Sequence, residues 1–183
     1  MLNPRTNALV LIVVMAAATR LLPHPPNVTS LHALALFGGA YFADRRLAFG
    51  VPLLALFLSD LILGFYPHML VQYAGCALLV AIGLGLQQHR TVGRIAASGV
   101  LGAVVFFILT NFAEWAFQPW YPKTLAGLAS SYVAAIPFFG NSVAGDAFYL
   151  ALLFGGARLL ELRYSAFAAG YTGGVLGVPG RNR

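Results

Sequence analysis

The sequence predicts an all-α integral membrane protein, with six transmembrane helices in one domain that comprises residues 1–183. The first observation is composition: 60% of the residues are hydrophobic and 9% are charged, and the mean hydropathy is +0.80. Such a chain has too few polar side chains to cover a water-soluble globule. The second observation is that the apolar runs are long and do not alternate with a period of two, which favours helices over a β-barrel.

The third observation is the spacing of these runs along the chain. The expected spans are residues 7–22, 31–42, 47–65, 69–86, 95–115 and 142–162. Arg20 and the segment Pro23-His24-Pro25-Pro26 follow the first run, and they do not fit the cleavage site of a signal peptide. We therefore expect the first run to remain as a span, and the polar residues 27–30 to cap the second helix.

The basic residues predict the topology. With six spans, nine of the eleven lysines and arginines lie on one side of the membrane: Arg5, Arg45, Arg46, Arg90, Arg94, Arg158, Arg163, Arg181 and Arg183. Only Arg20 and Lys123 lie on the other side. The positive-inside rule then puts both termini in the cytoplasm of a bacterial inner membrane. It also explains the net charge of +6 better than binding to nucleic acid does.

This topology places most intramembrane polar side chains in the outer half of the membrane. These residues are Asp60, Gln72, Cys76, Asn111, Glu114, Asp146 and Tyr149. Polar side chains that converge in this way indicate a pocket that opens outward. Residues 111–146 contain both tryptophans and three prolines, so we expect residues 111–141 to be a broken segment between the fifth and sixth helices that caps the pocket.

Each candidate residue also has a simpler interpretation. Cys76 shares a helical face with Gln72 and Tyr73, but a lone membrane cysteine is often only a small packing residue. Asp60 and Asp146 could bind a ligand, pair with a cation such as Arg20, or lie at the interface. The histidines His24, His32 and His68 could bind metal or lie at the interface. The aromatic residues Trp115, Trp120, Tyr121 and Tyr132 could line the site or form an interfacial belt.

The pentapeptide Leu-Phe-Gly-Gly-Ala occurs at residues 36–40 and again at 153–157. Glycines in membrane helices allow a neighbouring helix to approach closely. We therefore expect both copies to mark close helix contacts.

Four segments resemble the substrate-binding S components of energy-coupling factor (ECF) vitamin transporters. They are residues 21–27 (LLPHPPN), 35–42 (ALFGGAYF), 121–128 (YPKTLAGL) and 135–139 (AIPFF) with Gly145-Asp146. The resemblance implies six helices with an outward-facing vitamin pocket. The cobalamin-specific S component of the BtuM type is the member in which a pocket cysteine makes chemical sense. It implies that Cys76 coordinates the cobalt of cobalamin and could remove cyanide from cyanocobalamin, with His24, His32 or His68 as competing ligands.

One departure from that resemblance concerns the energising module. S components that share a module often carry a small-xxx-small pattern on the first helix, and residues 7–22 lack it. The expected function is therefore binding and uptake of cobalamin or a related vitamin, with a different coupling surface or without the module. The alternatives are an S component for another vitamin and a structural membrane protein without a small ligand. A membrane enzyme is disfavoured, because the sequence offers no set of acid, base and nucleophile.

Overall fold

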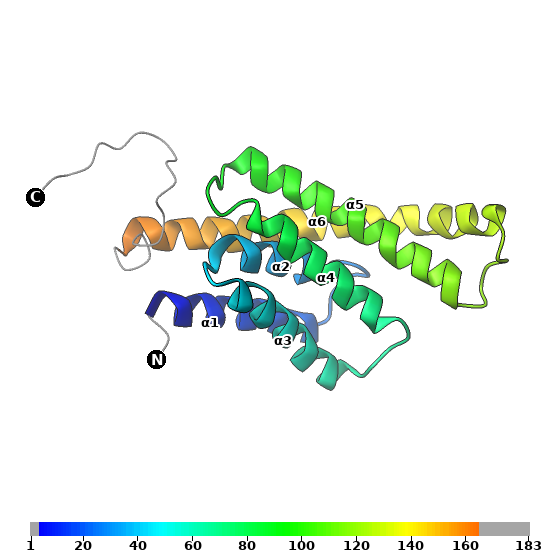
Figure 1. Ribbon diagram of the computed structural model, residues 1–183, viewed down its shortest axis with the longest axis horizontal. Coiled ribbons are helices and arrows are strands. Elements are labelled where there is room, and N and C mark those ends of the chain that lie inside the picture. Colours follow the sequence, from blue (N-terminus) through cyan, green and yellow to red (C-terminus); the bar gives the residue numbers. More distant parts are fainter. Residues whose placement is uncertain (1–3, 165–183) are drawn as a thin grey trace, which may run out of the picture.

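The computed structural model describes residues 4–164, which form six α-helices, one short 3-10 helix and no β-strand (Figure 1). The elements are α1 (Pro4–Ala18), η1 (Thr19–Leu21), α2 (Leu31–Tyr41), α3 (Arg45–Leu63), α4 (Met69–Leu84), α5 (Val92–Phe117) and α6 (Leu125–Arg163). The predicted all-α fold and the number of helices are confirmed.

Four segments are long and apolar enough to cross a membrane: Pro4–Leu21, α3, α5 and α6. α2 has 11 residues and α4 has 16, so they measure about 17 Å and 24 Å at the helical rise of about 1.5 Å per residue. The hydrocarbon core of a bilayer is about 30 Å thick. Six helices are therefore present, whereas six complete spans remain a prediction.

α2 is the central helix of the bundle. All of its residues are buried, and helices α1, α3, α4, α5 and α6 pack around it. A short helix that is apolar all round is stable in this position, because the neighbouring helices bury all of its apolar surface. The core around α2 includes Phe37, which stacks on Tyr41 and meets Phe154 of α6 edge-on.

The glycines of the first pentapeptide explain how closely α2 is packed. A Cβ atom added to Gly39 would overlap the carbonyl oxygen of Val80 on α4, and one added to Gly83 of α4 would overlap the carbonyl oxygen of Leu36. Glycine therefore lets the α2 and α4 backbones touch, as predicted. For the glycines of the second pentapeptide the prediction was wrong, because a Cβ at Gly155 or Gly156 would have no neighbour within 4 Å. Gly155 lines an open space between α5 and α6, and the residues of this pentapeptide that are buried in the core are Leu153, Phe154 and Ala157.

The expected break between the fifth and sixth helices is much shorter than predicted. α5 continues to Phe117 and α6 begins at Leu125, so only residues 118–124 connect them. The Thr124 side chain accepts a hydrogen bond from the Gly127 amide and caps α6 there. Pro137 lies inside α6, where the apolar sequence on both sides continues the helix despite the lost hydrogen bond. The prediction that residues 111–141 form a broken segment that caps the pocket was therefore wrong.

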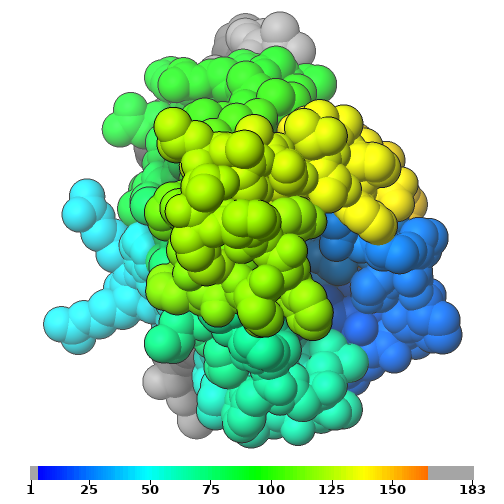
Figure 2. Space-filling model, turned by 90° about the vertical axis from the view of Figure 1, so that its right-hand side faces the viewer, coloured from blue at the N-terminus to red at the C-terminus, as the bar shows by residue number. Residues whose placement is uncertain are grey.

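Successive helices run in opposite directions along the long axis of the bundle (Figure 1). The arginines at 5, 45, 46, 90, 94, 158 and 163 are thus brought to one end, which we call the arginine end; Arg181 and Arg183 lie outside the described residues. The connections 22–30, 64–68 and 118–124 lie at the opposite end. Figure 2 faces that end, with the α5–α6 hairpin in yellow-green at the centre and the first connection in blue beside it.

Candidate functional site

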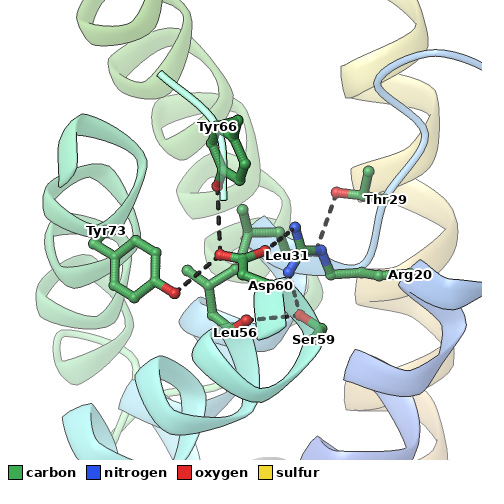
Figure 3. A network of polar contacts seen from close by, with 8 residues as sticks. All are labelled: Arg20, Thr29, Leu31, Leu56, Ser59, Asp60, Tyr66 and Tyr73. Carbon is green, nitrogen blue, oxygen red and sulfur yellow. Dashed lines mark hydrogen bonds and ion pairs between the residues drawn. The ribbon is translucent and has the colours of Figure 1, made fainter. Parts of the chain in front are cut away.

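A buried ion pair joins η1, which precedes the first connection, to α3, and a tyrosine of α4 contacts the pair. Arg20 lies 3.0 Å from Asp60, and the two side chains are only 9% and 0% exposed. Arg20 also donates to the Ser59 hydroxyl, and the Tyr73 hydroxyl donates to Asp60 over 2.9 Å. Figure 3 shows these side chains around the Asp60 carboxylate, with Thr29 beside Arg20. Of the interpretations of Asp60, pairing with Arg20 is therefore the one that the structure supports.

Tyr66, in the turn between α3 and α4, completes this network. Its hydroxyl lies 3.5 Å from Asp60. Burial, with the negative charge of Asp60 beside it, raises the pKa of Tyr66 to about 12. The phenol therefore stays protonated and donates toward Asp60 at neutral pH.

A second buried pair joins α2 to α6. His32 Nδ1 and an Asp146 oxygen lie 2.8 Å apart, and the two side chains are 11% and 6% exposed. The His32 ring also packs against Phe106 of α5, with the ring centroids 4.2 Å apart. Because an ionised carboxylate only accepts hydrogen bonds, Nδ1 carries the proton. Nε2 is then the nitrogen that can interact with a ligand.

A polar cavity of about 330 Å³ lies next to the His32–Asp146 pair. Seven polar residues from five parts of the chain line it: Asn27, Thr29, His32, Gln72, Thr110, Asn111 and Ser142. Phe106, Phe107 and Phe138 supply its apolar walls. The cavity is the place where polar groups converge inside an otherwise apolar bundle, so we take it as the candidate ligand site.

The first connection covers this cavity. Asn27 and Thr29 line it, and the Asn141 side chain of α6 donates to the Pro26 carbonyl over 3.2 Å. Gly145 allows this approach, because an added Cβ would lie 3.1 Å from the Val28 Cα. Ser30 makes no side-chain cap for α2; instead its hydroxyl donates to the Ala16 carbonyl over 2.7 Å. The predicted capping role is therefore wrong for Ser30, whose hydroxyl ties the connection to α1, whereas the Thr29 hydroxyl accepts a hydrogen bond from the Leu31 amide at the start of α2 over 3.4 Å.

Cys76 lies in the core and lines neither the polar cavity nor the cavity between α5 and α6. It is 0% exposed and lies one helical turn from Gln72 on the same face of α4. A thiolate at this position would reach a ligand only if the polar cavity extended by one turn along α4. Coordination of cobalt by Cys76 therefore stays a prediction.

The other predicted residues divide into three groups. His32, Gln72 and Asn111 line the polar cavity, and Asp146 supports it through His32. Asp60 and Tyr73 belong to the Arg20 network. The remaining residues line neither the polar cavity nor the larger one between α5 and α6: His24, His68, Glu114, Trp115, Trp120, Tyr121, Tyr132 and Tyr149.

Contacts of the aromatic residues show why they are not in the polar cavity. Trp115 Nε1 donates to the Pro122 carbonyl over 2.9 Å and so braces the α5–α6 turn. Trp120 is 70% exposed in that turn, and the Tyr132 hydroxyl donates to the Ile108 carbonyl over 2.9 Å. His68 stacks on Phe117, with centroids 5.2 Å apart. These side chains stabilise the hairpin and the end of the bundle around it.

Sequence reasoning missed several residues that line the cavity. Thr110 directly precedes Asn111 in an apolar span, and two adjacent polar residues at such a position could have indicated a binding site. Asn27 was interpreted only as part of a cap, although its positive φ of 63° now shows a turn that brings it over the cavity. Phe106, Phe107 and Phe138 carry no signal in sequence, because aromatic residues are common throughout such helices.

The described residues hold no group of three or more histidines, cysteines or acids that could bind a metal ion. His32 and Asp146 form a pair, and the Ser142 hydroxyl donates to the Phe138 carbonyl of its own helix.

Fold and site together define an all-helical protein with helices of membrane-spanning length and a covered polar cavity. Residues 1–168 match DUF6580, a family of unknown function, and the chain belongs to this family. No curated protein and no solved structure matches the chain. The resemblance to S components stays a prediction.

Proposed function

We propose that this protein is a membrane transport protein that binds a small, polar nutrient in the cavity between α2, α4, α5 and α6. The observation that carries the proposal is the convergence of seven polar side chains from five parts of the chain on one cavity. Polar groups inside a membrane bundle are costly unless they meet one another or a ligand. A purely structural bundle would have no need for this arrangement.

The lining defines the chemical class of the ligand. No lysine, arginine, aspartate or glutamate lines the polar cavity, so it offers no counter-ion to a strongly charged molecule. Amides, hydroxyls and the His32 imidazole can donate to and accept from a neutral polar group. Phe106, Phe107 and Phe138 suit the face of a planar ring. A neutral heterocyclic compound therefore fits best.

Size points to a compact molecule. Pockets for drug-sized ligands have volumes of about 300–1,000 Å³, and the polar cavity, at about 330 Å³, is at the lower end of that range. One or two rings fit this volume. This favours uptake of a vitamin smaller than cobalamin, which is one of the alternatives left open by the sequence.

The test is ligand-induced stabilisation of the purified protein in detergent. A panel of water-soluble heterocyclic vitamins and nucleobases should contain a compound that raises the unfolding temperature, because a ligand at about 100 times its Kd stabilises the folded state by about 2.7 kcal/mol. Gln72→Leu, which removes an amide from the cavity, should abolish the shift. Gln88→Leu is the matched control, since Gln88 is exposed beyond the end of α4. A shift that survives Gln72→Leu would place the ligand elsewhere.

Cobalamin uptake with thiolate coordination is the second candidate function. The observation that favours it is the position of Cys76 one turn below Gln72, on the helical face that reaches the cavity. Cobalt would bind the sulfur as a soft donor and would drive loss of the thiol proton. Cyanide would leave the cobalt as the sulfur binds. The vitamin would then be chemically modified, and this modification would keep it inside the cell.

Absorption spectroscopy tests this second candidate. Bound cyanocobalamin should show a shifted spectrum with the parent protein and an unshifted one with Cys76→Ser, which changes little volume but removes the soft donor. Histidine substitutions at 24, 32 and 68 should leave the shift in place. Identical spectra for the parent and Cys76→Ser would eliminate thiolate coordination, and a shift lost only in a histidine variant would assign the axial position to that residue.

A further inference from the structure

A second and larger cavity, of about 800 Å³, lies between α5 and α6 on the arginine side of the polar cavity. Its walls are mostly small or apolar side chains. On α6 these are Ala147, Ala151 and Gly155, which follow one another at intervals of four residues and are exposed. On α5 they include Ala96 and Gly99. Small side chains on both walls leave the space between the helices open.

The geometry of the two helices gives this cavity the form of a wedge. α5 and α6 cross near their middle and diverge toward the arginine end (Figure 1). Both helices are long and apolar enough to span a membrane, so a wedge between them opens toward the lipid. An apolar cavity in that position suits hydrocarbon chains rather than a water-soluble molecule.

The wide end of the wedge is charged. Arg90, Arg158, Glu161 and Tyr41 line it, and Arg5 lies close enough to interact electrostatically with Arg90 and Glu161. Three arginines therefore lie around Glu161, whereas Asp146, the other acid that lines this cavity, is paired with His32. Arg158 approaches Glu161 only to 3.5 Å, and its side chain is 48% exposed. Strong charge-assisted hydrogen bonds are about 2.7–2.9 Å long, so its guanidinium keeps donors for a further anion.

We propose that an anionic phospholipid occupies this wedge. Its acyl chains lie along the small-residue faces of α5 and α6, and its phosphate binds Arg158 at the wide end. Charge complementarity decides between possible occupants: the excess of arginine over acid recognises an anionic headgroup, as basic pockets between transmembrane helices do. A neutral lipid would leave Arg158 with only the long contact to Glu161, which Arg90 also approaches.

Native mass spectrometry of the purified full chain tests the proposal. The parent protein is titrated with phosphatidylglycerol and, separately, with phosphatidylcholine of the same acyl chains. Phosphatidylglycerol should bind more tightly, and Arg158→Ala should weaken its binding about fivefold, the effect of one basic side chain near an anionic lipid, while phosphatidylcholine is unaffected. Arg163→Ala is the matched control, because Arg163 is exposed on the last turn of α6 but does not line the wedge.

A filling variant tests the acyl-chain part of the site without touching charge. Ala151→Phe adds a ring to an exposed position on the wall of the wedge, where no buried neighbour has to move. It should leave the unfolding temperature of the protein unchanged and weaken binding of both lipids. Persistence of tight phosphatidylglycerol binding in Ala151→Phe would overturn the proposal.

Four further outcomes would also overturn it. Equal affinity of the parent for the two phospholipids would remove the headgroup argument, and an equal loss in Arg163→Ala would show general surface attraction. Binding of oleate as tightly as phosphatidylglycerol would assign the wedge to a free fatty acid. A protein dimer that dissociates in Ala151→Phe would identify a second copy of the chain as the occupant.

Discussion

At the scale of single residues, the molecule is distinguished by charges that are buried and paired. Arg20 with Asp60, and His32 with Asp146, each connect parts of the chain that are far apart in sequence. A pair of this kind adds little net stability compared with an apolar alternative, but loss of one partner leaves an uncompensated buried charge. Such pairs therefore fix which helix faces meet.

Asp60→Asn should strongly destabilise the protein. Asparagine keeps the shape of the side chain but leaves the Arg20 guanidinium without its carboxylate in a site only 9% exposed. Breaking a buried pair in this way costs about 3–5 kcal/mol. Chemical unfolding in detergent micelles measures the change.

A double-mutant cycle separates this effect from a simple loss of polarity. Arg20→Met combined with Asp60→Asn should be more stable than Asp60→Asn alone, because the orphaned charge is removed. Glu114→Gln is the control, since Glu114 makes no ion pair within residues 4–164. Parent-like stability of Asp60→Asn would show that Arg20 is solvated without its partner.

Part of this residue-scale picture was predictable. Charged residues in apolar runs are conspicuous, so Asp60 and Asp146 were singled out from sequence, and pairing with a cation such as Arg20 was one of three interpretations, beside a ligand site and exposure at the interface. Whether Arg20 pairs with Asp60 or with Asp146 depends on how the helices are arranged, and a single sequence does not contain that information. The aromatic residues near 115–121 misled the interpretation because composition does not reveal whether a ring faces a cavity or braces a turn.

At the scale of elements, the central position of α2 depends on glycine. Gly39 and Gly83 oppose each other across the α2–α4 contact, where backbone meets backbone. The pentapeptide at 36–40 allowed this contact to be predicted. The identical pentapeptide at 153–157 gave a false prediction, because the local sequence does not determine which face of α6 turns toward the bundle.

Gly83→Ala should destabilise the bundle. The added Cβ would overlap the Leu36 backbone of α2, which cannot move without displacing a helix that is buried on all sides. Overpacking of this kind costs about 1–3 kcal/mol. Gly156→Ala on α6 is the matched control, since its Cβ would meet nothing within 4 Å, and alanine should stabilise that helix slightly. Equal unfolding midpoints for the two variants would contradict close α2–α4 packing.

At the scale of the whole molecule, helix lengths and charges must fit a membrane together. α6 has 39 residues and measures about 58 Å, which exceeds the total bilayer thickness of about 40–45 Å. At least one end of α6 would therefore extend beyond the membrane or lie along the interface. The sixth helix was predicted to begin only at residue 142, after a segment broken by prolines that include Pro137, because proline usually ends a helix in water, whereas neighbouring helices tolerate it inside a membrane bundle.

The arginine end predicts the orientation of the bundle in the membrane. Seven arginines of the described chain occur at helix ends on that side, so the positive-inside rule orients it toward the cytoplasm. The polar cavity then lies near the outer face, where a nutrient would enter.

Because the chain has one cysteine and it is buried, Cys76→Ser gives a background for labelling. In intact cells a membrane-impermeant maleimide should react with Lys123→Cys, in the exposed α5–α6 turn, and should react with His89→Cys, in the exposed α4–α5 connection, only after the membrane is opened. The reverse labelling pattern would show the opposite orientation, with the polar cavity near the cytoplasm. The role of the protein would then be release or export rather than uptake.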